Sequence, residues 1–378
     1  MSGPQVPTLS PRQALARRLA GVRLNDIREP GERAAGMAEG AEGITGAELE
    51  ADPGRWLGAP GAEAMLICAR GRRSLAYAEK LEQQGYKGLS SVSGGTEAWR
   101  AEGLPMQAPA ADADFLERYA RHLSLPEVGL AGQRRLEAAT VALVGAGGLG
   151  SPAAFYLAAA GVGHIRLADP DRVERSNLQW QILHRDAGVG QGKAASARAA
   201  LKALNPRVNV ESWDERISAA NVEAFLQGTE VVVDGADNFA ARYLLSDACV
   251  KLGKPLVYGA VERFQGQVSV FDAGRRRGQA PCYRCLFPAP PPPQFAPNCA
   301  EAGVLGVLPG VIGLLQATEA IKLLLDLGEP LAGRLLHFDA KTLRFRETRL
   351  RPDPDCPVCA TGRTFPGYID YARWCAGD

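Results

Sequence analysis

The chain has 378 residues, of which 46% are hydrophobic and 22% charged, a composition typical of folded proteins and a length sufficient for two domains. Its formal net charge of +1 excludes the strong positive field that nucleic-acid binding or attraction to an anionic membrane requires. The first residues lack the apolar core of a secretory signal, and no apolar run approaches the roughly 20 residues of a membrane-spanning helix. We therefore expect a cytoplasmic protein without nucleic-acid or membrane partners.

A stretch without apolar periodicity, rich in alanine and proline, predicts where one domain ends. It places a linker at 106–114, between a first domain of residues 1–105 and a second of residues 115–378. In the first domain, the buried strand Met65–Cys68 precedes a helix over Ser74–Gln84, which predicts a small α/β unit.

The second domain alternates apolar strands with helices. Val141–Val144, Ile165–Asp169 and Glu230–Asp234 are expected strands, and such alternation predicts a mostly parallel sheet covered on both faces. After Gln265 the pattern changes to period-two alternation, which predicts antiparallel edge strands. The fold class is therefore α/β, with a Rossmann-like sheet following a smaller α/β domain. The proline run at 288–293 predicts an extended crossover.

Four of the eight cysteines form two C-x-x-C pairs. In a chain without a secretion signal, such pairs favour metal binding over disulfides. Four thiolates make a closed tetrahedral site for structural Zn²⁺, although the gap between the pairs is longer than in a compact zinc ribbon and disulfides remain the alternative. The predicted ligands are Cys282, Cys285, Cys356 and Cys359.

A glycine loop, Gly145-Ala-Gly-Gly-Leu-Gly150, connects an expected strand to a helix, as nucleotide-binding loops do. Asp169 suits a ribose hydroxyl both in an NAD-dependent oxidoreductase and in an ATP-binding enzyme. Lys193, at the expected start of a helix, and Asp237, beyond the strand that ends at Asp234, would supply the phosphate-binding lysine and the Mg²⁺ carboxylate that ATP chemistry needs. Each one could be a surface charge, but their combination favours ATP.

The ordered motifs RYARH, GAGGLG, DxDxVExSNLQxQ, GxGK and ADN, closed by the two C-x-x-C pairs, resemble the molybdopterin-synthase adenylyltransferase and thiamine-biosynthesis (MoeB/ThiF) family. These enzymes are related to ubiquitin-activating enzymes, and the resemblance covers roughly Phe115 to Gly362. It implies an ATP site formed by Gly145, Gly147, Gly148, Asp169, Asp171, Ser176, Asn177, Leu178, Gln179, Trp180, Lys193, Asp237 and Asn238.

The resemblance also implies a reaction. AMP is joined to the C-terminal glycine of a ubiquitin-like sulfur carrier protein (MoaD/ThiS-like), with release of pyrophosphate. Asp237 would bind Mg²⁺, Lys193 would act on the phosphates, and Arg121 would reach into the neighbouring subunit's site of a homodimer.

One residue departs from the family pattern. Trp180 stands where the family has an arginine, and an indole brings no positive charge to a triphosphate. Arg175 or Arg185 could substitute for it. A non-enzymatic scaffold that presents a sulfur carrier is the alternative that this departure raises.

Cys68 begins the loop Cys-Ala-Arg-Gly-Arg-Arg-Ser between an expected strand and helix. Backbone N–H groups and three arginines there favour a thiolate or persulfide. A buried core cysteine is the usual interpretation at the end of a strand, but the arginine-rich, glycine-bearing loop favours a reactive one. A phosphatase loop would have arginine at the position of Ser74. With Asp26–Glu29 and Gly94–Trp99, the region 10–105 resembles rhodanese domains, although Gly36–Ala47 departs from their usual pattern, and the resemblance implies that Cys68 carries a persulfide.

The resemblance to fused adenylyltransferase–rhodanese proteins implies the order of events. Sulfur from thiosulfate or a persulfide donor would pass through Cys68 to the activated carrier, giving a C-terminal thiocarboxylate for molybdenum cofactor, thiamine or a related pathway. Cys299 would be the thiol that releases the product, or else a structural cysteine.

Overall fold

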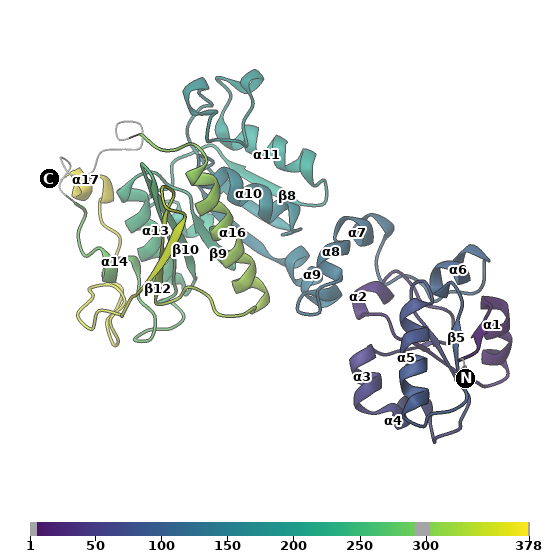
Figure 1. The fold of residues 1–378 in the computed structure, drawn as a ribbon. Coiled ribbons are helices and arrows are strands. Elements are labelled where there is room, and N and C mark those ends of the chain that lie inside the picture. The colour runs from purple at the N-terminus through teal and green to yellow at the C-terminus, as the bar shows by residue number, and fades with distance from the viewer. Residues whose placement is uncertain (1–5, 292–302, 377–378) are drawn as a thin grey trace. The chain divides into compact units, whose positions relative to one another are not determined.

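The computed structural model describes residues 6–291 and 303–376. The chain divides into two compact units, an N-terminal unit of residues 1–133 and a C-terminal unit of residues 134–378. Each unit has its own sheet (Figure 1). Each also has its own buried core. Helix α9 (Gly129–Ala138) runs across the division.

Five parallel strands form the sheet of the N-terminal unit, in the order β1-β5-β4-β2-β3. The central strand β4 reads Ala-Met-Leu-Ile and is buried throughout, as a parallel strand covered by helices requires. It ends directly before Cys68. The strands are β1 (Thr8–Leu9), β2 (Arg23–Asp26), β3 (Glu42–Gly43), β4 (Ala64–Ile67) and β5 (Leu89–Val92).

Short helices accompany these strands, and several begin at a capping residue. Helix α1, for example, follows Ser10, whose hydroxyl accepts the N–H of Gln13, and it has Pro11 in its first turn. The helices are α1 (Pro11–Leu19), α2 (Pro30–Arg33), α3 (Gly46–Ala51), α4 (Pro53–Leu57), α5 (Arg72–Gln83), α6 (Gly95–Ala101), α7 (Ala113–Arg118) and α8 (Ala120–Leu123).

The predicted linker at 106–114 belongs to the N-terminal unit. The N–H of Gln107 donates to Met37 O, and the N–H of Ala110 donates to Ala34 O. Helix α8 also packs against α2. By its contacts, the compact N-terminal unit reaches residue 133 and includes this segment. An alanine- and proline-rich segment carries no periodicity, so its sequence does not show that its backbone is hydrogen-bonded.

The eight-stranded sheet of the C-terminal unit has the order β13-β12-β11-β10-β9-β6-β7-β8. It is parallel from β10 to β8 and antiparallel from β10 to β13. This confirms the predicted parallel sheet with antiparallel edge strands. The strands are β6 (Thr140–Val144), β7 (His164–Ala168), β8 (Asn209–Trp213), β9 (Val231–Asp234), β10 (Leu256–Glu262), β11 (Gln265–Phe271), β12 (Arg334–Asp339) and β13 (Arg344–Arg349).

Helices cover both faces of this sheet (Figure 1). Helices α10 (Gly150–Ala159), α11 (Lys193–Leu204) and α16 (Leu308–Leu325) pack on one face. Helix α13 (Phe239–Leu252) packs on β9 and β10 from the other face and contacts α12, α14 and α17. The remaining helices are α12 (Val222–Leu226), α14 (Tyr283–Leu286), α17 (Tyr371–Ala376) and the short 3₁₀ turns η1 (Arg175–Asn177) and η2 (Asp186–Gly188).

Helix α16 is 18 residues long and apolar enough, by length and composition, to cross a membrane. The sequence pattern predicts a helix over Ile312–Leu325 with one strongly apolar face, and the structure has a helix there that begins at Leu308. More than half of it is buried inside the protein, where it packs against α10 and the strands β9, β10 and β11. Its apolar residues therefore belong to the core of this unit.

Candidate active site

A cleft of about 770 Å³ opens beyond the carboxyl ends of β6 and β9 in the C-terminal unit. Successive strands run from β6 toward β7 and β8 on one side, whereas β9 returns on the other side. This change of direction is a topological switch point, where ligands of open α/β sheets bind. The loops after β6 and β9 supply Gly145 and Gly235 to the lining of the cleft.

The glycine loop can follow its path only because side chains are missing from it. Gly145 has a φ of +94°, and a Cβ there would lie 2.5 Å from Gly235 O. A Cβ on Gly150 would collide with Gly145 O. These two glycines let β6 turn tightly into α10, while Gly147 and Gly148 line the cleft.

Asp169 holds the glycine loop in place at the end of β7. One carboxylate oxygen accepts the Ala146 N–H at 2.8 Å, and the other accepts the Asp171 N–H at 2.9 Å. Burial raises the pKa of Asp169 above its usual value, although Lys193 and these two N–H groups oppose the shift. Each oxygen keeps a second lone pair, so Asp169 can still accept a ligand hydroxyl.

Lys193 is the first residue of α11 and is almost fully buried. Its Nζ lies 3.2 Å from Asp171 Oδ2, and its backbone N–H donates to Asp171 O. An ammonium at the positive end of a helix dipole is unfavourable by itself, so the placement favours an anionic ligand nearby.

The structure places most of the predicted nucleotide residues around this single cleft. Leu178 is absent from the described residues that line it, and Arg121 lies on α8 in the N-terminal unit, so its role in a neighbouring subunit stays a prediction. Cys299 lies outside the described residues. The predicted residues that line the cleft are Gly145, Gly147, Gly148, Asp169, Asp171, Ser176, Asn177, Gln179, Trp180, Lys193, Asp237 and Asn238.

Trp180 lies over the glycine loop. A Cβ on Gly148 would be only 2.9 Å from Trp180 Cδ1, so the indole rests against the loop backbone. The two arginines expected to replace the missing charge do not line the cleft: Arg175 pairs with Asp186, and Arg185 donates to Ile182 O and His184 O.

Sequence reasoning missed several lining residues. Arg216 and Arg242 bring positive charge to the cleft, and Glu215 brings a carboxylate. Val304 precedes α16 and Pro309 lies in its first turn, and both are far along the chain from the glycine loop. No motif marks these positions, because they reach the cleft through the packing of distant elements.

Asp237 follows β9, and Asn238 caps α13 by accepting the Ala241 N–H. Asp237 Oδ1 accepts a hydrogen bond from the Asn238 amide. Asp237 is exposed and lines the cleft, so its carboxylate is accessible to a ligand there. Hard oxygen donors of this kind suit Mg²⁺, which is held through one or two carboxylates and the substrate phosphates.

Cys68 is the second candidate reactive centre, and it lies in the N-terminal unit. Its Sγ accepts hydrogen bonds from the backbone N–H of Ser74 at 3.3 Å and the Ser74 hydroxyl at 3.4 Å. Burial is the largest influence and opposes ionisation, but these bonds and the N–H groups of Arg70 and Gly71 together lower the pKa of Cys68. These donors favour the thiolate form of the sulfur.

The arginines of this loop contribute less than the sequence predicted. Arg70 pairs with Glu97 at 2.9 Å, and Arg73 pairs with Glu32 at 2.5 Å. The hydrogen-bond donors to the sulfur are backbone groups and Ser74. In the sequence, Ser74 differs from a phosphatase loop, and no motif marks it as a donor to the sulfur.

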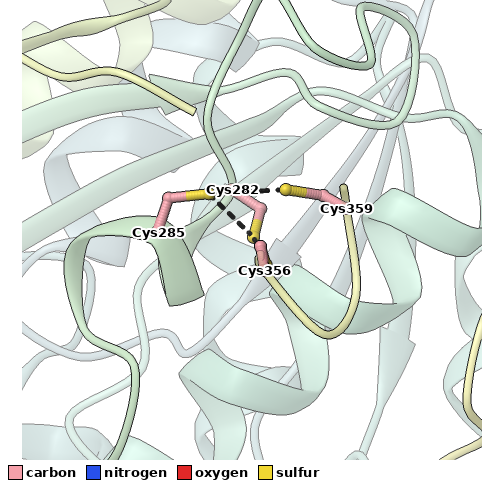
Figure 2. A group of neighbouring side chains, drawn as sticks. All are labelled: Cys282, Cys285, Cys356 and Cys359. Carbon is pink, nitrogen blue, oxygen red and sulfur yellow. Dashed lines mark hydrogen bonds between the residues drawn. The ribbon is translucent and has the colours of Figure 1, made fainter. Parts of the chain in front are cut away.

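Figure 2 shows the four paired cysteines pointing toward one another, two from the start of α14 and two from a segment near the C-terminus. Their sulfur atoms all lie within 4.8 Å, and the closest pairs are 3.4 to 3.8 Å apart. Tetrahedral Zn–S bonds of about 2.3 Å place sulfurs about 3.8 Å apart. The cluster could therefore hold zinc, and the four cysteines are free thiols rather than disulfides.

The comparisons agree with this geometry. The ThiF family pattern matches residues 119–358 and the rhodanese-like domain pattern matches residues 11–102. A sulfur carrier protein adenylyltransferase of Thermus thermophilus is 51% identical over 69% of this chain and 96% of its own length. This chain belongs to the ThiF family. In this ThiF-family chain the rhodanese-like domain precedes the ThiF domain.

Other relatives have related names. A SAMP-activating enzyme E1 of Haloferax volcanii is 52% identical over 70% of this chain and 97% of its own length. The adenylyltransferase and sulfurtransferase MOCS3 of Anopheles gambiae is 48% identical over 69% of this chain, which spans only 59% of that enzyme. Escherichia coli MccB, solved with ATP, shares the fold with a TM-score of 0.54 and 22% identity over 65% of this chain and 72% of that one.

Proposed function

We propose that this chain adenylylates the C-terminal glycine of a ubiquitin-like sulfur carrier protein with ATP and then converts it to a thiocarboxylate. The observation that carries the proposal is the cleft at the switch point, where the glycine loop, Lys193 and Asp237 converge. It occurs in a chain that is 51% identical to a sulfur carrier protein adenylyltransferase over nearly all of that enzyme. An NAD-dependent oxidoreductase has no use for this lysine and carboxylate.

Different residues of the cleft act at different points in the activation of the carrier carboxylate. The glycine-loop N–H groups and the start of α11 favour phosphate oxygens, and Lys193 adds a cation at the same place. The carrier carboxylate attacks the α-phosphorus of ATP, a new C–O–P linkage forms, and the bond to pyrophosphate breaks. Lys193 then stabilises the negative charge that develops on the leaving group. Asp237 would hold Mg²⁺, which neutralises phosphate charge when it is bound.

Sulfur transfer is proposed to use Cys68. Its thiolate takes the outer sulfur of thiosulfate, releasing sulfite and leaving a persulfide. The terminal persulfide sulfur attacks the acyl-adenylate, displaces AMP and leaves an acyl disulfide. A second thiolate then attacks the Cys68 sulfur, which frees the carrier thiocarboxylate and leaves a disulfide for a cellular thiol to reduce. Cys299 is our proposed second thiol.

The proposal includes three further properties. Zn²⁺ would be bound by the four-cysteine cluster in a closed structural role, because the four sulfurs leave no open position for a substrate. Arg121 would act in the cleft of a second copy, which requires a homodimer. The chain would work in the cytoplasm, where thiols stay reduced.

The test is carrier-dependent exchange of radioactive pyrophosphate into ATP, followed by mass spectrometry of the carrier after addition of thiosulfate. The matched control is the same carrier without its terminal glycine. Exchange with the intact carrier alone, and a mass gain corresponding to replacement of one oxygen by sulfur, are the expected results. Exchange that does not depend on the carrier would contradict the proposed substrate.

A further inference from the structure

His184 lies buried behind the glycine loop, and no step of the proposed function uses it. Its Nε2 is 3.0 Å from Ala146 O, and its Nδ1 is 3.0 Å from Ser196 Oγ. Ala146 is a fully buried residue of the glycine loop, and Ser196 lies in the first turn of α11. The imidazole therefore connects the glycine loop to the helix that begins with Lys193.

The contacts of His184 fix its protonation. A carbonyl oxygen only accepts hydrogen bonds, so Nε2 carries the proton that it donates to Ala146 O. Nδ1 can then accept the Ser196 hydroxyl, and the neutral ring satisfies both partners. Burial, with additional repulsion from Lys193 and Arg185, lowers the pKa of His184. The contact with Ala146 O places a proton on Nε2, and burial and the nearby cations favour the neutral form of the imidazole.

These contacts complete a closed path of hydrogen bonds and backbone between the glycine loop and the start of α11. Ala146 N–H donates to Asp169, Asp171 N–H donates to the same carboxylate, and Lys193 N–H donates to Asp171 O. From Lys193 the first turn of α11 leads to Ser196, and His184 returns to Ala146. Both sides of the Ala146 residue are thus held, its N–H by Asp169 and its C=O by His184 and the Ser151 hydroxyl.

We infer that His184 is a positioning residue that fixes the glycine loop against the start of α11 and so sets the spacing between the loop N–H groups and Lys193. Glycine-rich backbone is flexible, and a phosphate site works well only when its donors are held before the ligand arrives. The His184 imidazole supplies that restraint through its hydrogen bond to Ala146 O. The inference about nucleotide affinity rests on the proposed function, whereas the restraint on the loop does not.

Two substitutions separate the hydrogen bond from the bulk of the side chain. In His184→Gln the amide nitrogen can occupy the position of Nε2 and keep the donor to Ala146 O. In His184→Asn the shorter side chain reaches only the position of Nδ1 and loses that donor. Neither side chain titrates. Because the Ser151 hydroxyl still satisfies Ala146 O, both variants are expected to fold.

The first measurement is hydrogen–deuterium exchange of the peptide that contains residues 145–150, without nucleotide. We expect exchange several-fold faster in His184→Asn than in the wild type, and nearly wild-type exchange in His184→Gln. The second is pyrophosphate exchange, where loss of one hydrogen bond should raise the KM for ATP about threefold to tenfold in His184→Asn and leave kcat within about twofold. A merely structural role would reduce the active fraction and kcat without moving KM.

The exchange of residues 145–150 in the three proteins shows whether His184 restrains the loop through its hydrogen bond. Equal loop exchange in the wild type and both variants would overturn it, and so would equal effects of the Gln and Asn substitutions, because packing rather than the donor would then matter. If a His184 variant does not fold, Ser196→Ala removes the hydrogen bond between His184 Nδ1 and the Ser196 hydroxyl. This variant should give the same faster exchange of residues 145–150. If the wild type shows no carrier-dependent activity, the proposed function fails. The comparison of loop exchange still tests whether His184 restrains the glycine loop.

Discussion

Replacing Ser74 by alanine should weaken the thiolate of Cys68 without removing the sulfur. The substitution deletes the hydroxyl 3.4 Å from Sγ but keeps the backbone N–H at 3.3 Å. The side chain is fully buried, so water does not take its place readily. We expect the pKa of Cys68 to rise and sulfur transfer below that pKa to slow.

The size of the effect follows from the hydrogen bonds of the hydroxyl. A hydrogen bond to a charged group contributes roughly 1.5–3 kcal/mol, which corresponds to about one to two pKa units. Ser74 has one proton, and Gly71 O at 3.2 Å and Ser91 Oγ at 2.8 Å compete for it. The lower end applies, so the pKa should rise by about one unit and the thiolate fraction should fall about tenfold.

The assay is transfer of sulfur from thiosulfate to cyanide, measured across a range of pH. The wild type and Ser74→Ala should follow parallel profiles, with that of the variant displaced by about one unit toward high pH and the two rates converging above both pKa values. Ser74→Thr, which keeps the hydroxyl, is the matched control and should resemble the wild type. Unfolding midpoints of all three proteins show whether the fold is intact.

An unchanged profile in a well-folded Ser74→Ala protein would refute the reasoning, because the backbone N–H groups alone would then stabilise the thiolate. A lower plateau at high pH, with no displacement of the profile, would instead assign Ser74 to the geometry of the reaction.

Three other predictions concern different parts of the chain. Metal analysis should find one zinc per chain, and Cys356→Ser should lower both the zinc content and the unfolding midpoint, whereas Cys375→Ser should change neither. Cys68→Ala should abolish thiocarboxylate formation and leave carrier-dependent pyrophosphate exchange intact; loss of exchange would argue against separate reactive centres. Trp180→Arg should raise the rate of pyrophosphate exchange at least about tenfold, since one preorganised donor commonly contributes a factor of roughly 10²–10³ in rate at such sites. An unchanged rate would indicate that Arg216 or Arg242 already supplies the charge.

Much of the candidate site could be predicted because its residues lie in motifs at strand ends. The glycine loop, Asp169 and Asp237 each follow a strand whose apolar sequence is easily recognised, and parallel strands bring such positions to one edge. Arg216 and Pro309 could not be predicted in this way. Arg216 reaches the cleft from a loop and Pro309 from the first turn of α16, and no local pattern connects either one to it.

The sequence by itself determined the α/β class, the antiparallel edge of the second sheet, the place of the nucleotide loop and the four thiols, because periodicity and motif spacing are local properties. Only the tertiary structure decided which charges face the cleft and which are already paired, as with Arg70, Arg73 and Arg175. It also placed the alanine-rich segment after residue 105 in the N-terminal unit and joined His184 to Ala146, 38 positions earlier. Such contacts depend on how distant elements pack, and packing leaves no periodic trace in the residues that make them.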